Sequence, residues 1–126
     1  MFEHDYILRM IEQVAQTVAR AFGFIMQKQL EEAERQLDSG YGTLGLDREL
    51  LCVLDAQTIR KQFDHEETLA MAVRVLLCDA ELQHQRSDSQ NARRLLRAAE
   101  KVFGALASPH TDLANELRPA TQRISH

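Results

Sequence analysis

Apolar residues recur at steps of three and four along the first part of the chain, and this spacing is the feature that most constrains the fold. The apolar positions are Ile7, Leu8, Ile11, Val14, Ala15, Val18, Ala19 and Phe22. At about 100° per residue they fall on one face of a helix, while polar side chains occupy the other face. The spacing predicts a long amphipathic helix over residues 6–26, whose apolar face packs in a core rather than on a membrane.

A second long helix is predicted over residues 65–85, where Asp64 and Glu67 have the spacing of a capping box. This helix carries two apolar stripes, one of Leu69, Val73, Leu76, Leu77 and Ala80 and the other of Met71, Val75, Cys78 and Leu82. A helix with two apolar sides lies at the centre of a fold or meets a second chain. We therefore expect Met71, Val75 and Leu82 to belong to an interaction surface.

Shorter helices are predicted between these two. A break near residues 27–28 precedes a helix that ends at Gly40–Gly42, since glycine permits the left-handed backbone that terminates helices. Asp47 and Asp55 stand where an N-cap oxygen accepts hydrogen bonds from the first free amides of a helix. These signals predict two short helices over residues 47–62.

The last part of the chain is also predicted to be helical. Ser87 and Gln90 form a further capping box, which predicts a helix over residues 88–106. A short last helix follows, and we expect Pro119 to stop it because proline lacks the amide hydrogen that a helix interior needs. Residues 120–126 are then expected to form a frayed tail.

Composition favours an all-helical fold. Of the 126 residues, 44% are hydrophobic and 6% aromatic, tryptophan is absent, and five glycines and two prolines are too few to punctuate a sandwich or barrel. The chain has enough apolar material for one core and is too short for two ordinary ones. We predict a single all-α domain over residues 1–126, built from antiparallel helix pairs with five to six helices.

Charge and cysteine content indicate the cellular setting. The formal net charge of −4 argues against nonspecific binding to nucleic acid or to anionic membranes. The two cysteines, Cys52 and Cys78, form neither a disulfide framework nor a metal-binding spacing. The first residues lack the basic region of a secretory signal, and no apolar run is long enough to cross a membrane. We therefore expect a cytoplasmic protein.

Two parts of the chain share a spacing of small residues. Ala21, Phe24, Ala33, Leu37 and Gly40 occupy the same offsets as Ala80, Gln83, Ala92, Leu96 and Ala99. Small residues facing each other across a helix–turn–helix let the helices approach closely, so the spacing resembles the tetratricopeptide helix pair, a scaffold that binds partner proteins. The copies lie 59 residues apart, more than the roughly 34 of a tetratricopeptide array. This favours two helix pairs joined by an irregular connection.

The opening segment Asp5–Gln13 reads D-Y-I-L-R-M-I-E-Q. Together with Leu30-Glu31-Glu32-Ala33 and Gly45-Leu46-Asp47, it resembles a family of small bacterial helical proteins of unknown function, whose members share the motif D-Y-I-x-R-M-I-E-Q and a tetratricopeptide-like tail. The resemblance spans most of the chain and implies a helical fold and a bacterial origin. It implies no catalytic residues.

The most distinctive polar cluster is formed by Asp5, Tyr6, Arg9 and Glu12. Asp5 and Arg9 have the i, i+4 spacing of a helical ion pair, and Glu12 lies about one turn further along. The cluster is either a recognition patch or an ion-pair network that stabilises the helix start. The sequence alone leaves both interpretations open.

A basic face is formed by Arg93, Arg94 and Arg97 on the helix predicted over 88–106. Such a face meets phosphate or an acidic peptide, or it is simply hydrated. No aromatic residues alternate with these arginines to stack on bases, and the chain is acidic overall, so the pattern argues against nucleic acid.

No sequence pattern assigns a catalytic residue, a cofactor or a metal. The five histidines are scattered, and the spacing of a helical metal site occurs once, at Glu81 and His84. A nucleophile elbow, a glycine-rich phosphate loop and a Cys/His pair are all missing from the sequence. We therefore predict neither a catalytic site nor a bound cofactor or metal.

These observations predict a non-enzymatic protein-interaction or scaffold module that self-associates as a homodimer. The helices over 6–26 and 65–85 carry more apolar surface than one layer of helices covers. One alternative is an enzyme or small-ligand binder with a cleft between the helix pairs, lined by Tyr6, Arg9, Glu12 and Tyr41. Another is a nucleic-acid-associated regulator that uses the basic face of helix 88–106.

Overall fold

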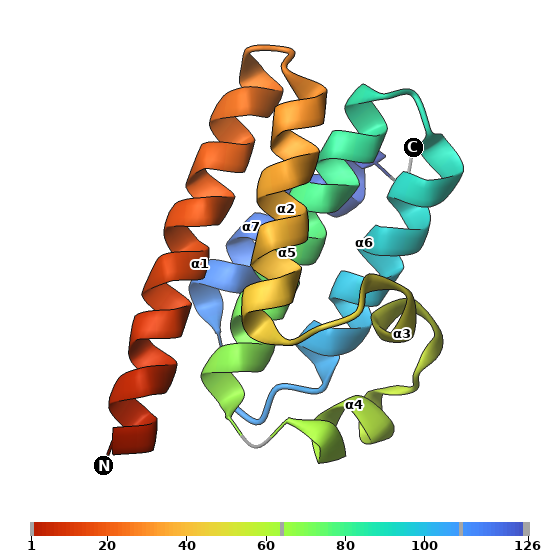
Figure 1. Cartoon of the computed structure of the whole chain (residues 1–126). Coiled ribbons are helices and arrows are strands. Elements are labelled where there is room, and N and C mark those ends of the chain that lie inside the picture. Colours follow the sequence, from red (N-terminus) through yellow and green to blue (C-terminus); the bar gives the residue numbers. More distant parts are fainter. Residues whose placement is uncertain (1, 64, 109, 125–126) are drawn as a thin grey trace.

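The computed structural model describes residues 2–63, 65–108 and 110–124. These residues contain seven helices and no strand. The helices are α1 (Phe2–Met26), α2 (Leu30–Leu44), α3 (Arg48–Val53), α4 (Ala56–Gln62), α5 (Glu66–Gln85), α6 (Ser89–Gly104) and α7 (Thr111–Ile124) (Figure 1). The all-α prediction is confirmed, and the prediction of five to six helices was too low. Within these ranges, none of the helices combines the length and hydropathy needed to cross a bilayer.

The helices α1 and α2 form an antiparallel pair, which we call the first pair (Figure 1). The turn between them passes through Lys28, whose backbone is left-handed with a φ of 64°, at the predicted break. The predicted helix end at Gly40–Gly42 was wrong, because Gly40 is buried against α1 and α5 and the helix continues. Gly45, with a φ of 69°, supplies the left-handed backbone that ends α2.

The short helices α3 and α4 begin at aspartates. Oδ1 of Asp47 accepts a hydrogen bond from the amide of Glu49 at 2.8 Å, and Oδ1 of Asp55 accepts one from the amide of Thr58 at 2.8 Å. Two short helices over residues 47–62, each with its aspartate N-cap, are therefore confirmed.

The helices α5 and α6 form the second pair, again antiparallel (Figure 1). Asp88 is the N-cap of α6, because its side chain accepts a hydrogen bond from the amide of Asn91 at 3.2 Å. Ser87 instead belongs to the preceding turn, with a left-handed φ of 63°. The predicted capping box of Ser87 and Gln90 was therefore wrong by one residue.

The central helix of the fold is α5, which packs against α1, α2, α6 and α7. It follows His65, which makes no side-chain cap hydrogen bond, and the predicted cap Asp64 lies outside the described residues. Both predicted apolar stripes of α5 are buried. The small residues that were expected at helix contacts are fully buried, namely Ala21, Ala33, Ala80, Ala92 and Ala99. One hydrophobic core draws on all seven helices, while the tetratricopeptide likeness of the two pairs stays a prediction.

The last helix, α7, runs past Pro119 to Ile124. Pro119 is exposed, whereas Ala120 and Ile124 keep only 7% and 3% of their surface exposed. Burial of this last turn against the core outweighs the one amide hydrogen that proline lacks. The prediction of a helix stop and a frayed tail over 120–126 was therefore wrong up to Ile124, and residues 125–126 lie outside the described residues.

Candidate functional site

An apolar groove of about 620 Å³ lies between α1, α5 and α7, and we call it the α1–α5–α7 groove. Val18, Met71 and Leu77 are 9%, 6% and 7% exposed and form its floor. Ala15, Ala19 and Phe22 form the wall that α1 contributes. The alanine side chains are short, whereas the larger ring of Phe22 is 41% exposed. The α1 side of the groove is therefore shallow at the alanines and deeper at Phe22.

The wall of the groove continues along α1 as an exposed apolar flank. The α1 flank consists of Leu8, Ala15, Ala19, Phe22 and Met26, which lie within about 60° of one another around the helix axis. Leu8, Phe22 and Met26 are 45%, 41% and 81% exposed. A second hollow of about 360 Å³, which shares Phe22 with the groove, extends to Met26. From Ala15 to Met26 the flank is thus an apolar edge beside the groove, and Leu8 lies on the same side of α1 about two turns before Ala15.

Two ion pairs between α5 and α7 stand at the rim of the groove. Nη1 of Arg74 lies 2.7 Å from Oε1 of Glu116, and Arg123 pairs with Glu81. Each cation meets an anion from the neighbouring helix, so the rim carries little net charge. This arrangement suits an apolar partner better than a charged one.

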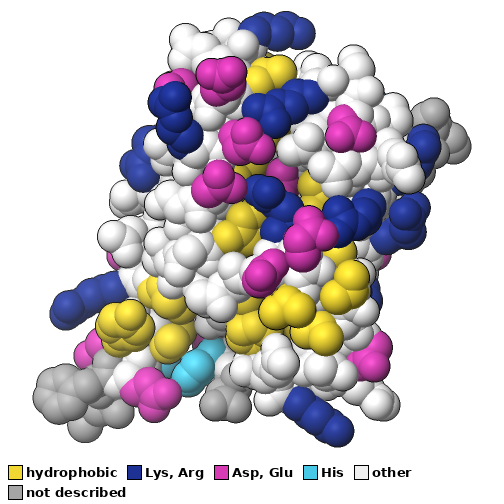
Figure 2. Space-filling model, turned by 45° about the vertical axis from the view of Figure 1, so that its right-hand side comes forward, with side chains coloured by type: hydrophobic (Ala, Val, Ile, Leu, Met, Phe, Trp, Pro, Cys, Tyr) yellow, Lys and Arg dark blue, Asp and Glu magenta, His cyan; other side chains and the backbone are white. Residues whose placement is uncertain are grey.

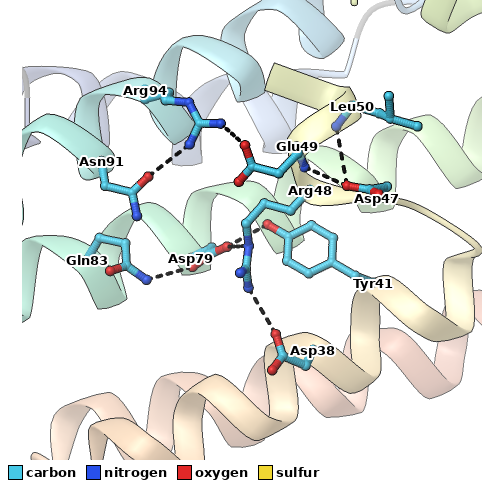
Figure 3. A network of polar contacts seen from close by, with 10 residues as sticks. All are labelled: Asp38, Tyr41, Asp47, Arg48, Glu49, Leu50, Asp79, Gln83, Asn91 and Arg94. Carbon is cyan, nitrogen blue, oxygen red and sulfur yellow. Dashed lines mark hydrogen bonds and ion pairs between the residues drawn. The ribbon is translucent and has the colours of Figure 1, made fainter. Parts of the chain in front are cut away.

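A buried polar network joins α2, α3 and α5 (Figure 3). The side chain of Asp79 is 0% exposed, and its Oδ2 accepts a hydrogen bond from the hydroxyl of Tyr41 at 2.8 Å. Its Oδ1 accepts a hydrogen bond from Nε2 of Gln83 at 3.2 Å. Nε of Arg48 lies 2.6 Å from Oδ2 as an ion pair, although this N–H makes no hydrogen bond of good geometry. The Asp79 carboxylate therefore has three side-chain partners.

Burial and charge fix the protonation of this network. Burial, together with the negative charge of Asp79, raises the pKa of Tyr41 well above its ordinary value of 10.0. Burial opposes the charge on Arg48, but the attraction of Asp79 outweighs it and raises the pKa of the guanidinium. The guanidinium also lies 4.9 Å from the centre of the Tyr41 ring. Tyr41 stays neutral and Arg48 stays charged near neutral pH, so the network ties helices together rather than exchanging protons.

The network was not predicted, although the sequence contains one sign of it. Asp79 is a single carboxylate within the apolar run of α5. A carboxylate on a buried helix face requires a cation or hydrogen-bond donors nearby. The partners Tyr41 and Arg48 come from other helices, and no spacing in the sequence connects them to Asp79.

The first residue of α5, Glu66, holds the loop that leads into α7. Its Oε2 accepts hydrogen bonds from the amides of Ala107 and Ser108, both at 2.9 Å, and lies 3.1 Å from Nε2 of His110. Burial opposes the charge, but the hydrogen bonds from Ala107 and Ser108 outweigh burial and lower the pKa of Glu66 to about 2. Glu66 thereby fixes the start of α7, which forms one side of the groove.

The second apolar stripe of α5 is buried in the core of the same chain. Met71, Val75 and Leu82 are 6%, 0% and 0% exposed, because the neighbouring helices cover them. The prediction that these side chains form an interaction surface was therefore wrong for Val75 and Leu82. Met71 lies at the floor of the α1–α5–α7 groove.

The predicted cluster of Asp5, Tyr6, Arg9 and Glu12 is exposed on α1. In the part of the chain that the structure describes, Asp5 and Arg9 form no ion pair, so the expected i, i+4 pair is not present. Tyr6, Arg9 and Glu12 border a shallow hollow of about 480 Å³ that also touches Thr43 of α2. A recognition role for this cluster stays a prediction.

Of the residues expected to line the alternative cleft, Tyr6, Arg9 and Glu12 border one hollow, and Tyr41 is not among its lining residues. Tyr41 is 5% exposed and donates its hydrogen bond to Asp79, whereas Tyr6 is 67% exposed on α1. The two tyrosines therefore lie in different environments and do not share a pocket.

One of the three arginines of the predicted basic face of α6 is engaged in contacts within the chain. Arg94 pairs with Glu49 of α3 and donates a hydrogen bond to Oδ1 of Asn91 at 3.3 Å. Arg93 and Arg97 make no ion pair or side-chain hydrogen bond with the described residues. Two of the three predicted arginines therefore remain available to a partner.

The described residues offer few side chains for metal binding or for thiol chemistry. These ranges contain no group of three or more His, Cys, Asp or Glu side chains that could hold a metal ion. Glu81, which has the metal-site spacing to His84, instead pairs with Arg123. Cys52 and Cys78 are free thiols, and burial raises the pKa of both. Neither thiol is therefore activated as a thiolate.

Comparison with known proteins assigns neither the groove nor the network. No protein-family model matches the chain, and no curated protein or solved structure matches it. The resemblance of the segment Asp5–Gln13 to a bacterial family stays a prediction, and a function has to be inferred from the geometry.

Proposed function

We propose that this chain is a non-enzymatic protein-interaction module that self-associates as a homodimer through the α1–α5–α7 groove and the α1 flank. The observation that carries the proposal is the groove of about 620 Å³, whose floor and α1 wall are apolar and whose charged rim residues are paired with one another. An apolar edge of this length on a small chain marks a protein contact, because exposing it to water costs free energy.

A second copy is the partner that fits the flank best. The flank is nearly symmetric about Ala15, since Leu8 and Phe22 each lie seven residues from it. Two antiparallel α1 helices related by a twofold axis would place Ala15 against Ala15 and Leu8 against Phe22 of the other copy. The small alanine lets the helices approach closely at the centre, while the large residues fill the ends. The seam from Leu8 to Phe22 would be about 21 Å long.

The rim of the groove supports the same pairing. Arg74 and Glu81 on α5 are neutralised by Glu116 and Arg123 on α7. A second α1 entering the groove therefore meets apolar side chains and balanced charges, without an unpaired charge that would have to be buried.

The test measures the mass of the protein in solution by light scattering over a wide concentration range. The wild type is expected to reach twice the 14.4 kDa of one chain. Ala15→Glu places a charge at the centre of the seam, and Phe22→Asp places one at its end, so both are expected to give monomers. The matched control is Val53→Asp, since Val53 is also apolar and exposed but lies on α3.

Two outcomes would overturn the proposal. One is a wild type that stays monomeric at every concentration. The other is a dimer that survives both Ala15→Glu and Phe22→Asp, because the contact would then lie elsewhere.

A second candidate function is binding of a small amphipathic ligand in the same groove. The volume of about 620 Å³ lies within the range of ligand pockets, and Arg74 and Arg123 stand at its rim. A monomeric wild type that enhances the fluorescence of an anionic apolar dye would support this candidate, provided that Ala15→Glu abolishes the enhancement.

We further propose a cytoplasmic location and no catalytic role. The free thiols of Cys52 and Cys78 fit a reducing compartment. The carboxylate of Asp79 is fully buried and contacts three side chains, so a reacting group in solution does not reach it.

A further inference from the structure

A second exposed apolar patch lies on α3, away from the groove. Leu50 and Val53 are 49% and 71% exposed. Figure 2 shows hydrophobic side chains gathered on the face that α3 and α4 form, with both acidic and basic side chains bordering them. Two large apolar residues kept exposed on one short helix, beside cations, form an amphipathic surface.

The cations beside this patch come from α6, because two contacts hold α3 alongside that helix. Arg94 pairs with Glu49, and Nζ of Lys101 donates a hydrogen bond to the backbone oxygen of Cys52 at 3.1 Å. Arg97 lies three residues after Arg94 and four before Lys101, so all three share one face of α6. Arg93 lies four residues before Arg97 and is therefore its neighbour on the surface of α6. We call Leu50, Val53, Arg93 and Arg97 the α3–α6 surface.

The charge of this surface is not balanced by the chain itself. Arg94 and Lys101 are engaged with α3, but Arg93 and Arg97 contact no acidic side chain within the described ranges. The helix α6 carries four basic residues and one acidic residue, in a chain whose net charge is −4. Acidic side chains also lie on this side of the molecule, but Asp47 caps α3 and Glu49 pairs with Arg94. Arg93 and Arg97 have no such partner among the described residues, and these two cations can attract an anionic partner.

We propose that the α3–α6 surface docks an acidic amphipathic segment of another protein. Apolar side chains of the segment pack on Leu50 and Val53, and its carboxylates pair with Arg93 and Arg97. The apolar patch distinguishes this partner from nucleic acid, for which exposed aromatic side chains would serve as stacking platforms. Among the described residues, the large exposed aromatic side chains are Tyr6 and Phe22, and both lie on α1.

The test uses a labelled amphipathic peptide of four helical turns, with leucine on one face and glutamate on both flanks. Its binding to the full chain is measured by fluorescence anisotropy at low ionic strength. Combining Arg93→Glu with Arg97→Glu is expected to weaken binding about tenfold or more. Leu50→Asp is expected to weaken it by a similar factor. Binding should also weaken as salt is added, because the paired charges are exposed.

Matched controls separate this surface from the groove. Arg118→Glu changes an exposed arginine on α7, and Phe22→Asp changes the α1 flank, so neither should alter peptide binding. This proposal is independent of self-association, since Phe22→Asp is expected to abolish the dimer and leave the peptide complex intact.

Three results would overturn the inference. The first is no binding of the glutamate peptide. The second is equal binding when its glutamates are replaced by glutamines, or when Arg93 and Arg97 are both reversed in charge. The third is tighter binding of a single-stranded oligonucleotide or of phosphatidylserine vesicles than of the peptide, with the same dependence on these arginines.

Discussion

The two helix pairs differ in how many other helices pack against them (Figure 1). In the second pair, α7 packs on α5 and α6, and the short helices α3 and α4 pack on α6. In the first pair, α1 packs on α2 and α5, and Leu8, Phe22 and Met26 stay exposed along it. Both pairs are built from amphipathic helices, so coverage by neighbouring helices, rather than composition, decides which apolar residues face water. A binding surface is therefore expected where that coverage stops.

The buried network of Asp79 lies where the two pairs meet. Tyr41 comes from the first pair, Asp79 and Gln83 from the second, and Arg48 from the connection between them. A fully buried carboxylate is stable only while its partners are present. A change in this network should loosen both pairs together, whereas a change on the α1 flank should alter association alone.

The largest effect is expected from Asp79→Ala, which tests whether the network joins the pairs. The change leaves the Tyr41 hydroxyl and the Arg48 guanidinium without their buried partner. The free energy of unfolding should fall by about 3–5 kcal/mol, measured by urea denaturation followed by circular dichroism. In contrast, Phe22→Asp at an exposed position should change the free energy of unfolding of the monomer by no more than about 0.5 kcal/mol.

The matched control for this prediction is Asp38→Ala. Asp38 also pairs with Arg48, at 3.1 Å, but its side chain is 62% exposed. An exposed ion pair contributes up to about 1 kcal/mol. If Asp79→Ala destabilises the protein no more than Asp38→Ala does, the network does not join the two pairs.

An intermediate effect is expected from Tyr41→Phe, which removes one hydrogen bond and keeps the ring. Because the acceptor is a buried carboxylate, the loss should be about 2 kcal/mol at neutral pH. The folded state holds the pKa of Tyr41 above 10.0, so the stabilisation is present below that pH and is lost as the pH rises above it. The difference between the two proteins in urea unfolding should therefore stay constant up to about pH 9 and shrink above pH 10.0.

A pH-independent difference up to pH 11 would show that Tyr41 titrates normally in the folded state. The ring should still lie beside Arg48 in the variant, so the near-ultraviolet spectrum of the remaining aromatic residues provides the control for an intact fold.

The sequence predicted correctly those features that depend on residues close together in the chain. The N-caps at Asp47 and Asp55 and the break before α2 follow from single residues and their spacing. The predictions failed where burial overrode a local rule, as at Gly40 within α2 and at Pro119 within α7.

The candidate sites were less predictable than the helices because they depend on contacts between distant segments. The apolar positions of α1 were all predicted as one face, and the spacing does not divide Val14, which is 1% exposed, from Phe22, which is 41% exposed. That division requires knowing that α7 leaves a groove beside α1. Likewise, Asp79 indicates that a partner is needed, but not that Tyr41 and Arg48 supply it.

The smallest effect is expected from Glu66→Gln, which tests the cover over the second pair. Glutamine keeps the shape of the side chain but brings an amide group toward the donors of Ala107 and Ser108, so the free energy of unfolding should fall by about 1 kcal/mol at neutral pH.

The folded state lowers the pKa of Glu66 from 4.5 to about 2. The stabilisation is therefore complete above pH 4.5 and is lost as the pH falls toward 2. Urea unfolding at several pH values should show the two proteins converging in this window, and a constant difference would mean that the carboxylate does not hold the loop. Since this loop positions α7, the same variant should weaken self-association less than Phe22→Asp does, and a stronger effect would move the contact from the α1 flank to α7.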